Sequence, residues 1–141
     1  MNTKTLMMIF VTGLALGGCN KADSPADAQQ QLAEARAQGN RDVADARADA
    51  QKDSIDAETD VAKAVADHNV GDAIDQAQEA HDVAARGNAR IQLAQAEANH
   101  KVAIEKCQVL AGDAQKQCKD RADADLDVAK DQEKMSRDAA R

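Results

Sequence analysis

Beyond residue 18 the sequence contains no aromatic side chain, and this limits what the chain can fold into more than any other feature. The single aromatic residue, Phe10, precedes that point. Of residues 19–141, 31 are Ala and only 16 are Leu, Ile or Val. Large apolar side chains contribute roughly 1.5 to 3 kcal/mol each when buried. With so few of them, the sequence excludes a thick globular core.

The remaining composition favours helix almost throughout. Ala has the highest intrinsic helix propensity, and Gln, Glu, Lys and Arg rank close behind it. We therefore expect an all-α, elongated chain with a thin, Ala-rich core, in which small side chains let the helices approach closely. Residues 19–141 carry 17 basic and 25 acidic side chains, a net charge of -8. Nucleic acid as a partner is not expected, because its binding requires a basic surface.

The first 20 residues have the organisation of an export signal. Lys4 provides a positive start, and an apolar run of about 11 residues follows over 6–16, against the roughly 20 that a membrane-spanning helix needs. Two small residues, Gly17 and Gly18, then precede Cys19. Small side chains at these positions suit a peptidase that cleaves beside them.

This stretch resembles the lipobox of bacterial lipoprotein signal peptides. The resemblance implies that residues 1–18 are a signal peptide and that Cys19 becomes an acylated first residue, carrying palmitate or a related chain. It also implies attachment to the outer membrane on the periplasmic side, because Asn20 replaces the Asp typical of inner-membrane lipoproteins. The alternative is an ordinary secretory signal cleaved elsewhere, in which Cys19 has no special role.

A long helical stalk is expected to follow the lipid closely. Residues 19–23 form a short tether, and Ser24 and Pro25 are typical of an N-cap and of the first helical position. From there the sequence predicts an Ala-rich stalk over residues 24–110, made of one or two long helices.

Four sites interrupt the helical pattern with the same chemistry, a Gly followed by Asn or Asp, and they begin at Gly39, Gly71, Gly87 and Gly112. Gly can end a helix in the left-handed conformation, and the next residue can cap a new helix. Inside a helix, Gly costs only about 1 kcal/mol. Helical composition resumes at once after Gly39 and Gly87, so we expect the helix to continue there and to break at Gly112. Both interpretations stay open for Gly71.

The motif Asp-Val-Ala recurs along the chain and places Val43, Val61 and Val83 near one face of a continuous helix. This thin stripe could dock against a partner helix or a second copy of the chain, although no sustained heptad register is evident. The alternative is a repeat that merely reflects biased composition.

Residues 33–66 also resemble late-embryogenesis-abundant-type helices, which have an 11-residue drift in their apolar positions. That resemblance implies a hydrophilic, stress-protective and partly disordered protein.

Two further cysteines, Cys107 and Cys118, would lie in an oxidising compartment. In an unbroken helix they would be about 16 Å apart, whereas a disulfide requires Cα atoms within about 7 Å. Their midpoint falls between Gly112 and Asp113. An antiparallel helical hairpin that turns there, with residues 111–141 as its second arm and tail, brings the cysteines together. A redox-active pair and an intermolecular disulfide remain as alternatives.

The segment 104–130 also resembles a group of exported proteobacterial proteins with no assigned activity. The shared features are a Cys, a short turn of the form Leu-small-Gly-polar-Ala and a second Cys, all within an Ala- and Lys-rich helical chain. The resemblance implies a periplasmic helical protein.

No catalytic pattern is present in the sequence. His68, His81 and His100 lie 13 and 19 residues apart and form no metal-binding motif, although His100 could face Asp125 across the hairpin. We expect no enzymatic activity, no metal, no cofactor apart from lipid on Cys19, and no small-molecule substrate.

The expected role is a lipid-anchored structural or interaction protein of the cell envelope, a helical spacer with the hairpin as its docking end. Its expected partners are the membrane and either an envelope protein or a second copy. The alternative is the stress-protective protein described above.

Overall fold

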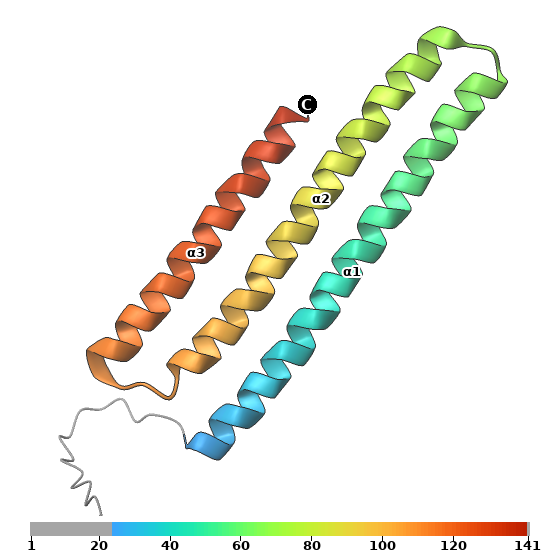
Figure 1. The fold of residues 1–141 in the computed structure, drawn as a ribbon. Coiled ribbons are helices and arrows are strands. Elements are labelled where there is room, and N and C mark those ends of the chain that lie inside the picture. The colour runs from blue at the N-terminus through green and yellow to red at the C-terminus, as the bar shows by residue number, and fades with distance from the viewer. Residues whose placement is uncertain (1–23, 141) are drawn as a thin grey trace, which may run out of the picture.

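The structure, a computed structural model, describes residues 24–140 and consists of three long helices (Figure 1). They are α1 (Pro25–Ala66), α2 (Val70–Cys107) and α3 (Gly112–Ala139). Successive helices run antiparallel, and short turns at 67–69 and 108–111 connect them. The predicted all-α, elongated fold is confirmed. The predicted signal peptide, Cys19 and the predicted tether lie outside the described residues.

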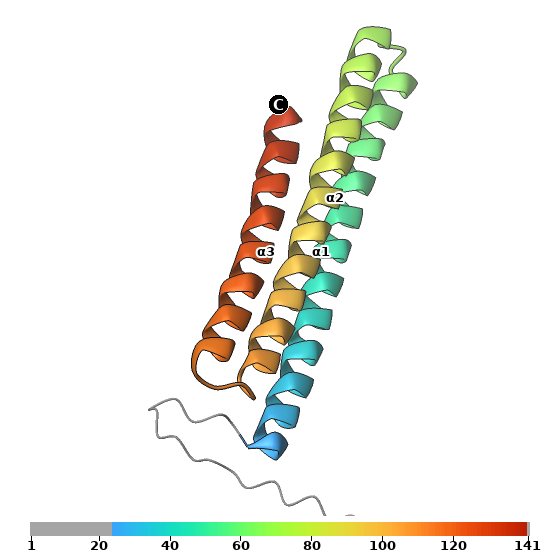
Figure 2. The ribbon, with the colours of Figure 1, turned by 60° about the vertical axis from the view of Figure 1, so that its left-hand side comes forward.

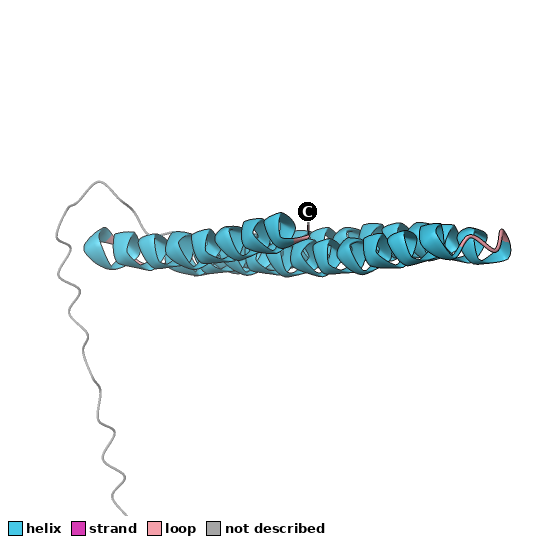
Figure 3. Ribbon diagram, turned by 90° about the horizontal axis from the view of Figure 1, so that it is seen from above, coloured by secondary structure: helices cyan, strands magenta, loops and turns pink. Residues whose placement is uncertain are grey.

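The three helices form a single layer with α2 in the middle. Within residues 24–140, α2 packs against both of its neighbours, whereas α1 and α3 do not contact each other. Figures 1 and 2 show the helices side by side, and Figure 3 shows the layer from its thin edge. Such a layer buries only two seams and encloses no central core. Two narrow seams can be filled mainly by Ala, which is why 16 large aliphatic residues are sufficient.

Helix α1 begins as the sequence predicts. Ser24 is the N-cap, and its hydroxyl oxygen accepts a hydrogen bond from the Asp27 N–H at 3.3 Å. Pro25 follows at the first helical position, where its missing N–H costs nothing. None of the three described helices is long and apolar enough to cross a membrane.

The helices continue through Gly39 and Gly87, as expected, and the structure supplies the reason. A Cβ on Gly39 would lie 2.7 Å from the Cβ of Ala98, and a Cβ on Gly87 would lie 3.0 Å from the Cβ of Ala50. The two contacts are 11 residues apart in each helix, or about three turns. Both glycines therefore lie on the α1–α2 seam and allow the two backbones to approach.

An 11-residue repeat organises the α1 side of this seam. Its buried and half-buried positions follow one another at spacings of four, three and four residues: Ala28, Leu32, Ala35, Gly39, Val43, Ala46 and Ala50. Eleven residues make three turns at 3.67 residues per turn, close to the natural helical period of 3.6. The seam therefore stays on one face without a heptad. The 11-residue drift implied by the resemblance of residues 33–66 is thus present, although the sequence does not show which Ala residues are buried, because exposed Ala residues surround the buried ones.

One residue of the Asp-Val-Ala stripe, Val43, packs against a helix of the same chain. Val43 is buried together with Ala94 and Ala98 of α2 in the core cluster. The continuous helix expected for the stripe is interrupted at 67–69, so that Val43 and Val83 lie on different helices. The stalk predicted over residues 24–110 is thus folded back on itself, and its reach is about half that of a straight helix.

Candidate functional site

The base of the layer is the end where α1 starts and where α2 turns into α3 (Figure 1). Cys107 and Cys118 form a disulfide there, with their Cα atoms 5.7 Å apart, and Cys107 is fully buried. The predicted antiparallel hairpin thus brings these two residues together. Nearby, Oε1 of Gln108 accepts hydrogen bonds from the side chains of Gln115, at 3.3 Å, and Lys119, at 3.2 Å. These contacts tie the turn to the first two turns of α3.

The turn itself lies earlier than Gly112 and Asp113, the residues predicted for it. Helix α2 already ends at Cys107, and residues 108–111 make the connection. Gly112 has φ +61 and is the first residue of α3, while Asp113 lies in the first turn of that helix. Closing the disulfide requires α2 to stop at the cysteine, and Gly112 then supplies the left-handed conformation at which α3 starts.

His100 connects α2 to α3 above the disulfide. Its Nε2 lies 2.7 Å from the carboxylate of Asp123, not from that of Asp125, the partner that the hairpin symmetry suggests. His100 and Asp125 still line the same cleft, so the register of the two arms is the predicted one, but the hydrogen bond is made to the carboxylate two residues earlier.

The tip of the layer is the opposite end, where α1 turns into α2. The His68 N–H donates to the Val65 carbonyl oxygen and the Asn69 N–H donates to the Ala64 carbonyl oxygen, both at 3.1 Å. This is the Schellman pattern, and the left-handed residue within it is His68, at φ 55, rather than a Gly. Asn69 then caps α2 by accepting a hydrogen bond from the Asp72 N–H at 3.2 Å. The break left open at Gly71 therefore lies before Gly71, at residues 67–69.

Large apolar side chains gather at the tip without being buried. Val70 is 72% exposed, Ile74 is 62% exposed and Val65 is 59% exposed. Together with Ala73 and Ala77 they line a shallow groove beside the turn. Sequence reasoning missed this patch because it depends on the turn, which brings the end of α1 next to the start of α2.

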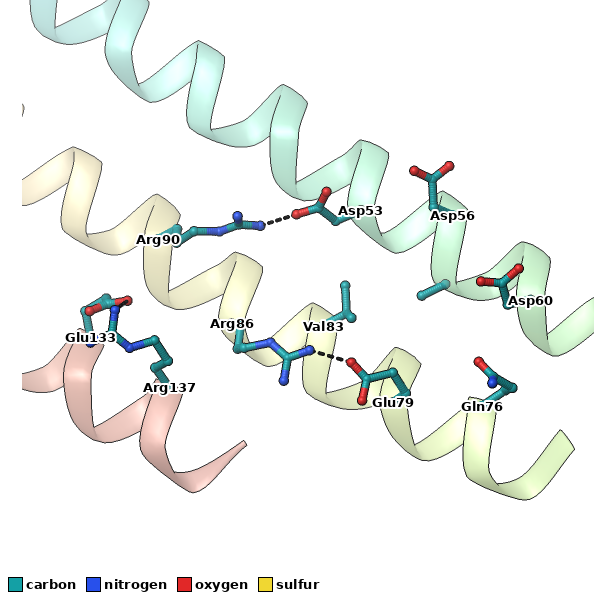
Figure 4. A pocket seen from close by; sticks show the side chains of 11 residues that line it. Asp53, Asp56, Asp60, Gln76, Glu79, Val83, Arg86, Arg90, Glu133 and Arg137 are labelled. Carbon is teal, nitrogen blue, oxygen red and sulfur yellow. Dashed lines mark hydrogen bonds and ion pairs between the residues drawn. The ribbon is translucent and has the colours of Figure 1, made fainter. Parts of the chain in front are cut away.

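A second, polar cleft lies near the C-terminal end of α3 and is lined by residues of all three helices (Figure 4). Arg90 reaches across to Asp53 of α1 at 2.5 Å. Arg86 binds Glu79 at 2.7 Å and donates to the Ala140 carbonyl oxygen at 2.8 Å, which secures the end of α3. The guanidinium groups are thus engaged by the protein itself, and the cleft functions as an ionic clasp between the helices.

A cross-helix ion pair also lies closer to the base. Nζ of Lys101 in α2 is 2.6 Å from the carboxylate of Asp42 in α1. Hydrogen bonds from Lys101 and then Gln38 lower the pKa of the Asp42 carboxyl below its ordinary value. The hydrogen bond from Arg90 lowers the pKa of Asp53 in the same way. Both carboxylates are therefore stabilised in their charged form at the α1–α2 seam.

The histidines remain apart in the structure. His68 is in the tip turn, His81 lies on α2 beside Asp82, and His100 faces α3. Within residues 24–140 no group of three or more His, Cys, Asp or Glu side chains is arranged to hold a metal ion.

The relative positions of base and tip correct the predicted arrangement of the spacer. The sequence suggests that the disulfide hairpin is the end farthest from the lipid. In the structure the hairpin turn lies at the same end as Ser24, the start of α1 (Figures 1 and 2). The far end is the tip, separated from the base by the 42 residues of α1, or about 63 Å.

Comparisons of the chain with protein-family models, with curated proteins and with solved structures find no match. The functional argument therefore depends on the sequence and on the geometry of the two ends.

Proposed function

We propose that this protein is a lipid-anchored spacer of the bacterial cell envelope, held in the outer membrane by acylated Cys19, which presents its tip to a partner protein in the periplasm. The lipobox-like organisation of residues 1–20 supports the anchor. The Cys107–Cys118 disulfide is in keeping with an oxidising compartment. Partner binding is assigned to the tip instead of the disulfide hairpin, because the hairpin lies beside the start of α1.

One observation carries this proposal: Val70, the most exposed large apolar side chain of residues 24–140, lies with Val65 and Ile74 at the end opposite the start of the folded chain. Val65, Val70 and Ile74 are all more than half exposed, although the chain has few large aliphatic residues to bury. Exposed apolar patches at such a site are typical of protein interaction surfaces. With α1 about 63 Å long, the patch is held well away from the anchor.

The charge around the tip indicates what the partner surface is like. Residues 56–79 contain seven acidic side chains and one basic one, a net charge of -6. A partner that fits this tip has an apolar centre surrounded by Lys and Arg, because complementary charge favours encounter and excludes like-charged proteins.

The anchor is tested by the Cys19→Ser variant produced in a bacterial cell with an envelope. We expect it to leave the membrane fraction and appear in the soluble periplasmic fraction, with the disulfide intact. A variant that stays in the outer membrane would show that Cys19 is not the anchor.

Docking at the tip is tested by a photo-cross-linking amino acid placed at Val70, compared with the same residue placed at the exposed Ala124 of α3. Irradiation of intact cells should give one discrete, saturable protein adduct for position 70 and none for position 124. Adding Ile74→Asp should abolish that adduct without changing helix content. Equal or absent cross-linking at both positions would rule out the tip as the docking site.

A further inference from the structure

We propose that the base of the layer touches the membrane directly, with Val109 and Leu110 of the α2–α3 turn placed among the lipid headgroups beside the anchor. The inference rests on the proposed acylation of Cys19 and extends it: the lipid fixes the protein to the membrane, and the turn fixes its orientation. The layer then stands on its base, with the tip facing away from the membrane.

The length of the tether brings the base to the membrane surface. Four residues, 20–23, separate Cys19 from Ser24. An extended chain covers at most about 3.6 Å per residue, so that Ser24 lies within roughly 18 Å of an acylated Cys19. Ser24 precedes α1 at the same end of the layer as the turn 108–111 (Figure 1). Whatever the turn exposes is therefore held close to the lipid.

The turn exposes two consecutive large apolar side chains. Val109 is 50% exposed and Leu110 is 38% exposed, and they stand between the end of α2 and the start of α3. Residues 19–141 contain only 16 Leu, Ile and Val residues, and two of them stand together at this turn with much of their surface exposed. Apolar side chains at a membrane interface gain free energy by leaving water for the boundary between headgroups and acyl chains.

The net charge of the two ends also favours the base, and not the tip, as the end that contacts the membrane. The base segments, 24–36 and 104–121, contain five basic and five acidic side chains and are neutral overall, whereas the tip segment 56–79 has a net charge of -6. Anionic lipids repel acidic segments and attract Lys and Arg near the surface. The exposed Lys106 and Lys116 flank the turn on either side. An anionic membrane therefore accepts the base and rejects the tip.

The start of α3 adds backbone hydrogen-bond donors at the base. Ala111 is the N-cap of α3 and makes no side-chain capping hydrogen bond. The first N–H groups of a helix have no partner within the helix and carry its positive dipole end. Figure 1 shows that the N-terminus of α3 lies at the base, at the same end as the start of α1.

A single tryptophan can report this contact, because residues 19–141, which remain after the proposed cleavage, contain no aromatic residue. The probe is the lipidated protein carrying Leu110→Trp, reconstituted in vesicles of phosphatidylethanolamine and phosphatidylglycerol with brominated acyl chains. Its matched control is the lipidated protein carrying Val70→Trp, at a position of the tip that is more exposed in the structure than Leu110. We expect Leu110→Trp to show blue-shifted emission and strong quenching by the brominated lipid. Val70→Trp should show neither change.

Adding Val109→Asp to Leu110→Trp should reduce the quenching to the level of the Val70→Trp control, while the protein still floats with the vesicles. If both tryptophans remain unquenched in protein that floats, the membrane contact is overturned and the anchor stands. If Val70→Trp is the quenched one, the orientation is reversed and the inference is overturned. If lipidated protein does not float, the anchor and the contact both fail.

Discussion

Gly39 and Ala98 lie face to face at a distance that leaves no room for a side chain between them. A Cβ on Gly39 would be 2.7 Å from the Ala98 Cβ, and nonbonded carbon atoms do not approach so closely. Eleven residues further along α1, Ala50 and Gly87 repeat the contact with Ala and Gly exchanged. The α1–α2 seam therefore gains stability from backbones in close contact, and only to a small extent from the burial of large side chains.

Gly39→Ala should destabilise the protein although Ala is the better helix former. The gain in helix propensity is about 1 kcal/mol, while forcing a methyl group into a filled seam costs roughly 1 to 3 kcal/mol. We expect a net loss of about 1 kcal/mol in the free energy of unfolding, measured by urea denaturation and circular dichroism. Gly71→Ala is the control, because its Cβ would meet only the Asn69 side chain, at 3.6 Å. It should be neutral or stabilising, and a stabilising Gly39→Ala would refute the close approach.

Reduction of the Cys107–Cys118 disulfide should weaken the α2–α3 arm. The cysteines are 11 residues apart, and closing a loop of this length contributes about 2 to 3 kcal/mol. Cys118→Ser should lower the midpoint of urea unfolding accordingly, while the α1–α2 seam, which the disulfide does not join, keeps its helix content at low denaturant. Intact mass after thiol alkylation, with and without a reductant, checks the bond itself. Two free thiols in protein from the periplasm would contradict it.

Acid should loosen the α1–α2 seam through Asp42 and Asp53. Hydrogen bonds from Lys101 and Arg90 lower the pKa values of these carboxyls in the folded state below the ordinary value of 3.8. Such groups contribute stability that is fully present above pH 3.8 and is lost as the pH falls through the lower, folded-state pKa. The melting temperature of the wild type should therefore drop more between about pH 5 and pH 2 than that of Asp42→Asn/Asp53→Asn. The exposed Asp49→Asn should behave like the wild type, and identical pH profiles for all three would argue against these pairs.

The tip turn should tolerate Gly but not a β-branched residue at position 68. His68 has φ 55, a conformation that Gly adopts freely and that costs other residues roughly 1 to 2 kcal/mol. We expect His68→Val to lower the free energy of unfolding by about 1 kcal/mol or more, because branching at Cβ crowds the left-handed backbone. His68→Gly should match or exceed the wild type. Thermal melts followed by circular dichroism distinguish them, and equal melts for the two variants would contradict the turn geometry.

A cooperative melt should separate an ordered layer from the stress-protective alternative. A chain of residues 19–141 in dilute buffer should be strongly helical by circular dichroism and should unfold in one transition, because α1 and α3 both pack against α2. A coil spectrum that becomes helical only in alcohol or on drying would favour the partly disordered protein.

The sequence by itself determined the helices and the disulfide hairpin. Ala-rich composition excludes a thick core, and Ser24 and Pro25 start α1. The spacing of Cys107 and Cys118 requires the chain to reverse between them if they bond to each other, as they do in the structure. These features depend on local propensity and on distances along one segment, which a sequence expresses directly.

Only the tertiary structure decided how the helices are arranged and which end is which. The reversal at 67–69 uses a left-handed His68, which sequence rules assign to Gly, so the break was expected at Gly71 if at all. Most of the seam residues are Ala and Gly, and these residue types give no sign in the sequence of whether they are buried or exposed. The fold at 67–69 brings the disulfide turn to the start of α1 and makes an apolar tip at the far end. The position of the two ends depends on contacts between residues far apart in the sequence, such as Asp42 and Lys101, which are 59 residues apart. No local sequence pattern encodes such contacts.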